Sequence, residues 1–158
     1  MDSFTVRYEF SQRFKVPARD AFGWCTDYRS DDWERMGKKG TRRIRHINED
    51  TLILTDTVEG REGAVTKRRL VRLYPERLAW TNTHVGGPNR HSQFWYQIVE
   101  EGAGKSRLDF TGLQVNYGNR PSPKGIAAMA RELKADDAGM WVLLAEEMYK
   151  ELNRQGHG

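Results

Sequence analysis

The sequence predicts an α+β fold in which a seven-stranded antiparallel sheet curves around a long C-terminal helix. Three observations predict it: an alternating strand near the N-terminus, a series of short strands through the middle, and an apolar stripe of helical spacing in residues 124–154. The predicted strands are joined by short, turn-rich segments. Parallel neighbours need long crossovers, so a doubly wound α/β fold is excluded.

The first predicted strand has apolar residues at even positions and polar residues at odd ones. The even set is Phe4, Val6, Tyr8, Phe10, Phe14 and Val16, and this period of two indicates one buried face. Pro17 then begins a short helix that runs to Cys25, because proline is favoured in a first helical turn. A second short helix is expected over 29–36, with Trp33 and Met36 pointing inward.

Six further strands are predicted over 42–48, 51–59, 65–74, 77–84, 91–100 and 106–115. The segments between them are rich in Gly, Pro, Asn and Asp and have the length of hairpin loops. The final helix follows, with a continuous apolar stripe made of Ile126, Met129, Leu133, Met140, Leu144, Met148 and Leu152. We expect a single domain over 1–158, with a disordered tail over 155–158.

The bulk properties exclude several classes of protein. The chain has 158 residues, a net charge of +4 and one cysteine, Cys25, so it forms no internal disulfide. Its longest apolar run, residues 140–145, is far shorter than the ~20 residues that a membrane span needs. A cytoplasmic protein without a membrane span is therefore expected, and its oligomeric state is left open.

Two local motifs resemble those of a known superfamily. The Val16-Pro17-Ala18 step into a helix beginning Arg19-Asp20-Ala21-Phe22, and the hairpin 73–80 (LYPERLAW), are similar to motifs of START/SRPBCC proteins, in particular of the polyketide cyclase/dehydrase-like branch. The resemblance implies a helix-grip fold with a cavity between sheet and helix. It further implies a lipid, sterol, polyketide or other apolar small molecule as ligand, and no cofactor.

The pocket wall is predicted from the even positions of the later strands, which combine large apolar groups with a few polar ones. The predicted ligand-binding residues are Trp80, Asn82, His84, Phe94, Tyr96, Phe110 and Gln114, with Met129 and Leu133 from the helix. An ordinary core, in which the polar members bond to backbone or water, is the alternative. Gln93, Trp95, Gln97 and Val99 form a rival inward face for the strand 91–100.

Two functions remain open on this scaffold. The first is binding of an apolar or amphipathic small molecule. The second is an enzyme of the cyclase, aromatase or dehydratase kind, for which His84, Tyr96 and Asp56 are the candidate catalytic residues. His84 and His91 flank the turn at 86–89, but with Asp56 they match no compact zinc pattern, so no metal site is predicted.

Basic residues cluster at 38–45 and at 67–72. A solvated sheet face is favoured over a nucleic-acid surface, because aromatic residues are not interleaved with the charges. The alternation within 67–72 puts Lys67, Arg69 and Val71 on one face and Arg68 and Arg72 on the other. One face must point inward, so an arginine inside the cavity is expected to bind a ligand carboxylate or phosphate.

Overall fold

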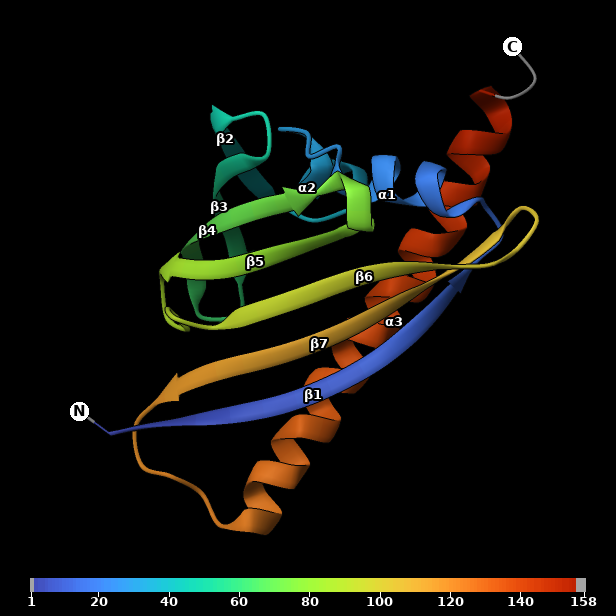
Figure 1. The fold of residues 1–158 in the computed structure, drawn as a ribbon. Helices are drawn as coiled ribbons and strands as arrows, with labels where there is room; N and C mark the ends of the chain where they lie inside the picture. The colour runs from blue at the N-terminus through green and yellow to red at the C-terminus, as the bar shows by residue number, and fades with distance from the viewer. Residues whose placement is uncertain (1, 156–158) are drawn as a thin grey trace.

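The computed structural model describes residues 2–155 and has the predicted architecture (Figure 1). A curved sheet lies over the long helix α3, and two short helices, α1 and α2, close one end. The strands are β1 Ser3–Phe14, β2 Gly40–Asn48, β3 Thr51–Gly60, β4 Gly63–Tyr74, β5 Ala79–Gly86, β6 Gln93–Gly102 and β7 Lys105–Tyr117. The helices are α1 Ala18–Thr26, α2 Asp32–Arg35, the 3-10 turn η1 Pro75–Arg77, and α3 Pro123–Gln155.

The sheet has seven strands in the order β1-β7-β6-β5-β4-β3-β2, and every neighbouring pair is antiparallel. From β2 to β7, strands that are consecutive in the sequence are also neighbours in the sheet, as short hairpin connections require. β1 pairs with β7 and is therefore an edge strand of the sheet, and α3 packs against it. This is the predicted fold class.

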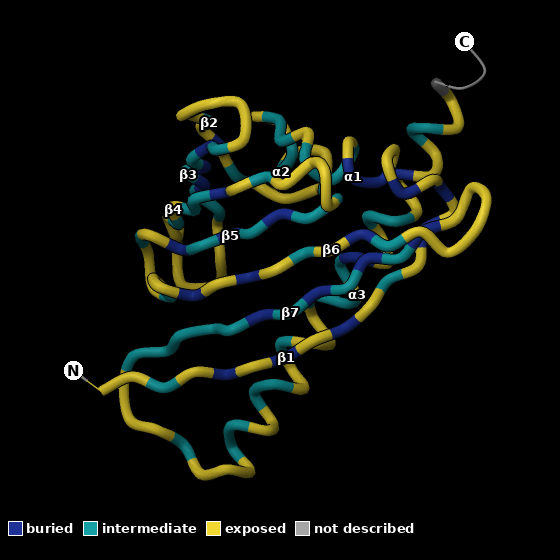
Figure 2. The backbone as a smooth tube through the Cα atoms, viewed as in Figure 1, coloured by how far each residue is buried: buried dark blue, intermediate teal, exposed yellow. Residues whose placement is uncertain are grey.

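Alternation along β1 places one face in the core. Val6, Tyr8, Phe10 and Phe14 are buried while the residues between them are mostly exposed (Figure 2). Phe10 lies opposite Phe110 of β7, and their rings stack with centroids 4.6 Å apart. Cross-strand aromatic pairs of this kind strengthen a sheet beyond the area they bury.

The same alternation shows which faces of β4 and β6 point inward, a question that the sequence left open. On β6, Phe94 and Ile98 are buried and Trp95 is exposed, so the even positions face inward and the rival face is wrong. On β4, Val71 is fully buried, which puts Lys67 and Arg69 on the inner face and leaves Arg68 exposed. Arg69 is therefore the inward arginine of this strand.

Three predicted boundaries are corrected by local backbone geometry. The second short helix covers only Asp32–Arg35, and the chain before it turns where the Arg29 amide donates a hydrogen bond of 2.9 Å to the Asp32 carboxylate. The strand predicted over 77–84 begins at Ala79, because Leu78 adopts a left-handed conformation after the 3-10 turn. The strand predicted over 91–100 begins at Gln93, because His91 also has a positive φ.

The helix α3 is continuous across its whole length and packs most extensively against β1. Met148, predicted in the apolar stripe, is fully buried, and Trp141, which was not predicted there, is buried as well. The Trp24 indole of α1 donates a 3.0 Å hydrogen bond to Glu151, which ties α1 to the last turns of α3. Of the predicted disordered tail 155–158, Gln155 is instead the last residue of α3, and 156–158 lie outside the described residues.

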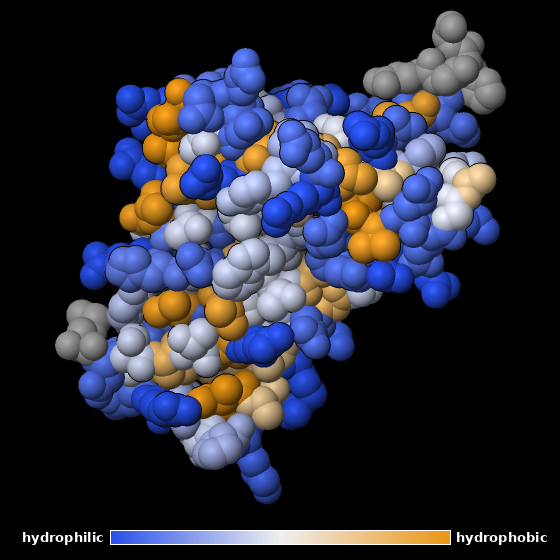
Figure 3. Space-filling view, in the orientation of Figure 1, coloured by the Kyte–Doolittle hydropathy of each residue, from blue (hydrophilic) through white to orange (hydrophobic). Residues whose placement is uncertain are grey.

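On the face in Figure 3, hydrophilic residues predominate and hydrophobic ones form separate patches. Among the described residues, no helix has the length and apolarity that a membrane crossing requires. The apolar residues are therefore concentrated between sheet and helix, where the candidate site lies.

Candidate functional site

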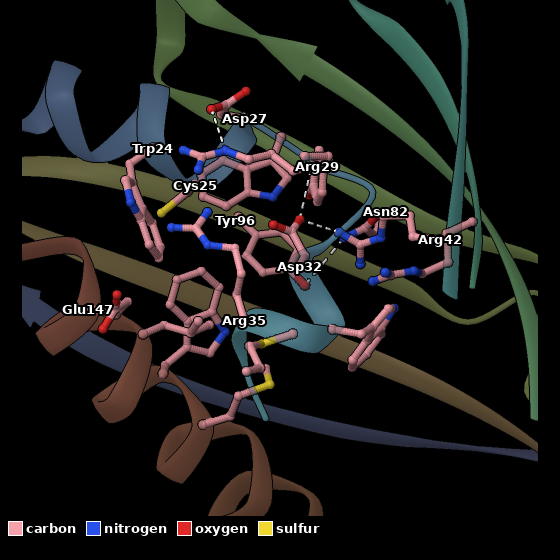
Figure 4. Close-up of a pocket in the computed structure, with 18 residues that line it drawn as sticks. Trp24, Cys25, Asp27, Arg29, Asp32, Arg35, Arg42, Asn82, Tyr96 and Glu147 are labelled. Atoms are coloured by element: carbon pink, nitrogen blue, oxygen red, sulfur yellow. Dashed lines mark hydrogen bonds and ion pairs between the residues drawn. The ribbon is translucent and has the colours of Figure 1, made fainter. Parts of the chain in front are cut away.

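Two adjoining cavities lie between the sheet and the helices. The larger has a volume of about 640 Å³ and is lined by residues of α3 and of the inner faces of β1 and β3–β7. The smaller, about 180 Å³, lies between α1, α2 and α3 and is drawn in Figure 4. Both are lined by Trp33, Arg69, Tyr96, Met140 and Trp141, so these side chains separate the two spaces.

Aromatic rings form much of the wall. The Phe94 and Phe110 rings stack with centroids 5.9 Å apart, and the Tyr96 ring meets Phe110 edge-on at 5.1 Å. Trp80 is 1% exposed and stacks on Tyr96 with centroids 4.7 Å apart. Flat apolar walls of this kind favour an aromatic or polycyclic ligand, because aromatic faces attract one another in offset and edge-on geometries.

A four-membered charge network crosses the strands at one side of the cavities. The Arg42 guanidinium donates to both carboxylate oxygens of Asp56, at 2.8 and 3.0 Å, and to Asp32 at 2.6 Å. Arg69 donates to Asp56 at 2.6 Å. Burial alone would raise the pKa of Asp56, but the hydrogen bonds and charges of Arg42 and Arg69 outweigh it and lower that pKa. Asp56 is thus a firmly ionised partner of two arginines.

His84 lies on β5 beside the aromatic wall, with its ring 5.1 Å from that of Phe94. Burial and the nearby cations of Arg69 and Lys67 lower the pKa of His84 to about 4. The ring is therefore neutral at pH 7. Its Nδ1 atom is buried and has no hydrogen-bond partner among the described residues. The His84 ring as a whole lines the larger cavity.

Tyr8 and Asp137 meet across the larger cavity. The Tyr8 hydroxyl, from β1, donates a short hydrogen bond to the Asp137 carboxylate on α3. Burial raises the pKa of Asp137, and the neighbouring Asp136 charge adds to the increase, although the bond from Tyr8 opposes it. Gly112 on β7 makes room for the Tyr8 ring, because a Cβ at that position would lie 2.8 Å from Tyr8 Cε1.

Lys67 is the remaining charged group on the inner sheet face. Its side chain is half-buried and lines the larger cavity, and it makes no salt bridge within 4.0 Å to any of residues 2–155. Burial lowers the pKa of its ammonium group, the Arg69 cation lowers it further, and the Asp137 carboxylate opposes this shift. Lys67 is therefore a cation in the cavity wall that makes no salt bridge with the described residues, and the Asp137 charge offsets it only through space.

The structure brings most of the predicted site residues together. His84, Phe94, Tyr96, Phe110, Gln114 and Leu133 line the larger cavity, as does Asp56, and Trp80, Asn82 and Tyr96 line the smaller one. Met129 lies half-buried on α3 and lines neither of these two cavities. Whether these residues bind a ligand stays a prediction.

The two histidines beside the 86–89 turn do not share a site. His91 is exposed, and its ring is hydrogen-bonded to the Tyr117 hydroxyl at 2.8 Å, whereas the His84 ring points to the interior. Within residues 2–155, no group of three His, Cys, Asp or Glu side chains is arranged to hold a metal ion.

Sequence reasoning missed Tyr8, Asp137 and Lys67 as members of the site. Tyr8 was assigned to the core by its even position, yet its hydroxyl reaches the cavity. Asp137 is a polar residue between Leu133 and Met140 of the predicted apolar stripe. Lys67 belongs to one of the two faces of its strand, and the sequence does not show which of these faces points inward. A polar group on an otherwise apolar face was the available signal in the first two cases.

The fold is shared with proteins of known structure. The chain aligns with an aromatase/cyclase from Streptomyces sp. R1128 with a TM-score of 0.73 and 13% identity, over 96% of each chain. It aligns with Ara h 8.0201 with a TM-score of 0.69 and 13% identity, over 93% of this chain and 99% of that one. For a START superfamily protein from Mycobacterium smegmatis the TM-score is 0.59 and the identity 18%, over 83% and 92%.

These likenesses establish the helix-grip fold, which an aromatase/cyclase and a START superfamily protein share with this chain. Identities this low carry the fold and not the chemistry. No family model and no curated protein matches the sequence. The function must therefore be argued from the cavity itself.

Proposed function

We propose that this protein binds an apolar or amphipathic small molecule, lipid-like or polyketide-like, in the larger cavity between the sheet and α3. The observation that carries the proposal is the cavity of about 640 Å³, whose wall combines aromatic and aliphatic side chains with several charged and polar ones, as an amphipathic ligand requires. Small-molecule sites typically enclose about 300–1,000 Å³. Burial of an apolar ligand stabilises the complex by roughly 25 cal/mol per Å² removed from water.

A cavity-filling substitution tests this proposal. Leu133 lines the larger cavity from α3, whereas Leu143 lies on the same helix and is 68% exposed. We expect Leu133→Trp to abolish saturable binding of N-phenyl-1-naphthylamine, an uncharged fluorescent probe, and Leu143→Trp to leave it unchanged. Equal binding by both variants, with thermal melts that show both to be folded, would contradict the proposal.

A second candidate function is enzymatic proton transfer on a bound ketone, as in a cyclase, aromatase or dehydratase. The observation that favours it is the Tyr8–Asp137 pair, because a buried carboxyl group with a raised pKa suits acid–base work near neutral pH. His84, Tyr96 and Asp56, which line the same cavity, remain the other candidates.

Deuterium exchange at the α-carbon of 2-tetralone, followed by NMR, tests this second function. An enzyme of this kind accelerates the exchange over buffer, and Asp137→Asn removes the acceleration. Exchange at the buffer rate, with 2-tetralone shown to bind, would leave only the binding function.

A further inference from the structure

Lys67 is the one cation on the inner face of β4 that makes no salt bridge with the described residues. Arg42 and Arg69 are bound to Asp56 and Asp32 through the bonds described above. Lys67 lies two residues before Arg69 on the same face of β4, and the Asp137 carboxylate acts on it through space without contacting it. A half-buried ammonium group without a hydrogen-bonded counterion is costly, and an anionic ligand would reduce that cost.

The backbone next to Lys67 is shaped to bring β5 close. The register between β4 and β5 shifts at Arg68 and Arg69, so a bulge interrupts the pairing there. Gly87 follows with φ +108°, and a Cβ at this residue would lie 2.8 Å from the Thr66 carbonyl oxygen and 3.3 Å from Lys67 Cα. Bulges often re-aim side chains beside functional sites.

His84 supplies a second group at the same place. It is paired with Arg69 across the β4–β5 ladder, it is 7% exposed, and it lines the same cavity as Lys67. Its ring is neutral, and a neutral imidazole ring donates one hydrogen bond from the nitrogen that carries its proton. An oxyanion between the two side chains would pair with the Lys67 ammonium group and accept that hydrogen bond.

The remaining groups around this point define the rest of the ligand. The ring of Phe94 packs on His84, and Phe110 stacks behind Phe94, so an aromatic body fits directly beside the charged head. The acids of the opposite wall lie on α3: Asp137 is hydrogen-bonded by Tyr8, and Asp136 is exposed. These carboxylates disfavour an anion at the helix, which leaves the sheet side as the place for it.

We infer that Lys67 and His84 form an oxyanion subsite, and that the ligand is an amphipathic aromatic acid whose carboxylate, sulfonate or acidic enol lies between them. This inference rests on the proposed function, since it assigns the ligand class of the same cavity. The subsite selects against neutral ligands of the same shape. Charge-assisted hydrogen bonds of this kind are the stronger ones in proteins.

Two fluorescent probes that share one ring system separate the effect of ligand charge on affinity from the effect of ligand shape. 1-Anilinonaphthalene-8-sulfonate carries a sulfonate, and N-phenyl-1-naphthylamine lacks it. We expect the wild-type protein to bind the sulfonate at least ten-fold more tightly. Lys67→Met should weaken sulfonate binding by roughly 10–100-fold and change binding of the neutral probe by less than about two-fold, as loss of a charge-assisted hydrogen bond predicts.

Arg68→Met is the matched control, because it removes the same charge from the next residue of β4 but on the exposed face. Arg68→Met should leave the ratio of sulfonate-probe affinity to neutral-probe affinity unchanged. Lys67→Arg, which keeps the charge, should retain most of the wild-type ratio. His84→Phe should reduce the ratio as well, by removing the second donor.

The outcomes distinguish the inference from the function on which it rests. Equal effects of Lys67→Met on both probes, or equal effects of Lys67→Met and Arg68→Met on the ratio, would overturn the subsite while binding itself stands. Tight binding of the neutral probe with no preference for the sulfonate would also overturn it. If neither probe binds the wild-type protein, both the cavity function and the subsite are wrong.

Discussion

The phenol of Tyr8, on the first strand, donates a hydrogen bond to the carboxylate of Asp137, in the middle of the C-terminal helix. The bond joins the two elements that close the larger cavity from opposite sides. It also places a carboxyl group of raised pKa in the wall of this cavity. The stability and the chemistry of the cavity are therefore linked through one pair of residues.

Asp137→Asn should become progressively more stable than the wild-type protein as the pH rises above 3.8, the ordinary pKa of this carboxyl group. Burial raises the folded-state pKa of Asp137 above its unfolded value. A group of this kind contributes full stability below the unfolded pKa and loses it as the pH rises through the folded pKa. Asparagine does not titrate, so it escapes that loss. Urea unfolding at several pH values measures the difference, and a constant difference would contradict the assignment.

His84 should titrate at about pH 4, because burial and then the Arg69 and Lys67 cations disfavour its charged form. The unfolded chain binds a proton at the ordinary value near 6.5. Stability should accordingly increase with pH between about 4 and 6.5, by roughly 3 kcal/mol from this group. NMR of the imidazole protons, assigned with His84→Gln, tests the value. A midpoint near 6.5 would show that the ring is solvated.

Asp56→Asn should reduce the free energy of unfolding by about 3–5 kcal/mol, because it leaves two arginines without their shared buried counterion. The side chains of Asp56 and Arg42 are only 3% and 5% exposed. Asp109→Asn is the control, since Asp109 pairs with Arg107 on the outer face at 40% and 35% exposure. That change should cost less than about 1 kcal/mol. Similar costs for both would show that the inner network is not desolvated.

Gly112→Ala should destabilise the protein by about 1–3 kcal/mol, because the added methyl group would push the Tyr8 ring from its place. Gly139 on α3 has open space where a Cβ would lie, and it is exposed. Gly139→Ala should therefore stabilise the helix by about 0.5–1 kcal/mol. Thermal melts of both variants give the two signs, and a neutral Gly112→Ala would mean that the ring can move at no cost.

The fold could be predicted from local patterns because each element carries its own period. Alternation along residues 4–16 and helical spacing along 124–154 are properties of neighbouring residues, and the turns between strands are short. The boundaries that failed depend on single backbone conformations. Leu78 and His91 adopt positive φ values. Residues other than glycine rarely adopt such values, and no pattern in this sequence predicts them at these two positions.

The candidate site was predicted only in part, because its contacts join residues that are distant in the sequence. The even positions of the later strands placed His84, Phe94 and Phe110 correctly on the inner face. The pairing of Tyr8 with Asp137 spans 129 positions and depends on the depth at which α3 lies against β1. The lack of a partner for Lys67 is likewise a property of the assembled wall and not of its strand.

The central claim is that the space between the sheet and α3 receives a small apolar or amphipathic molecule. The most direct measurement is the set of intermolecular nuclear Overhauser effects between bound N-phenyl-1-naphthylamine and the protein. The account predicts contacts from the probe's rings to Phe94, Phe110 and Leu133, which line the larger cavity. Saturable binding with contacts only to exposed residues such as Leu143, or no binding at all, would contradict it.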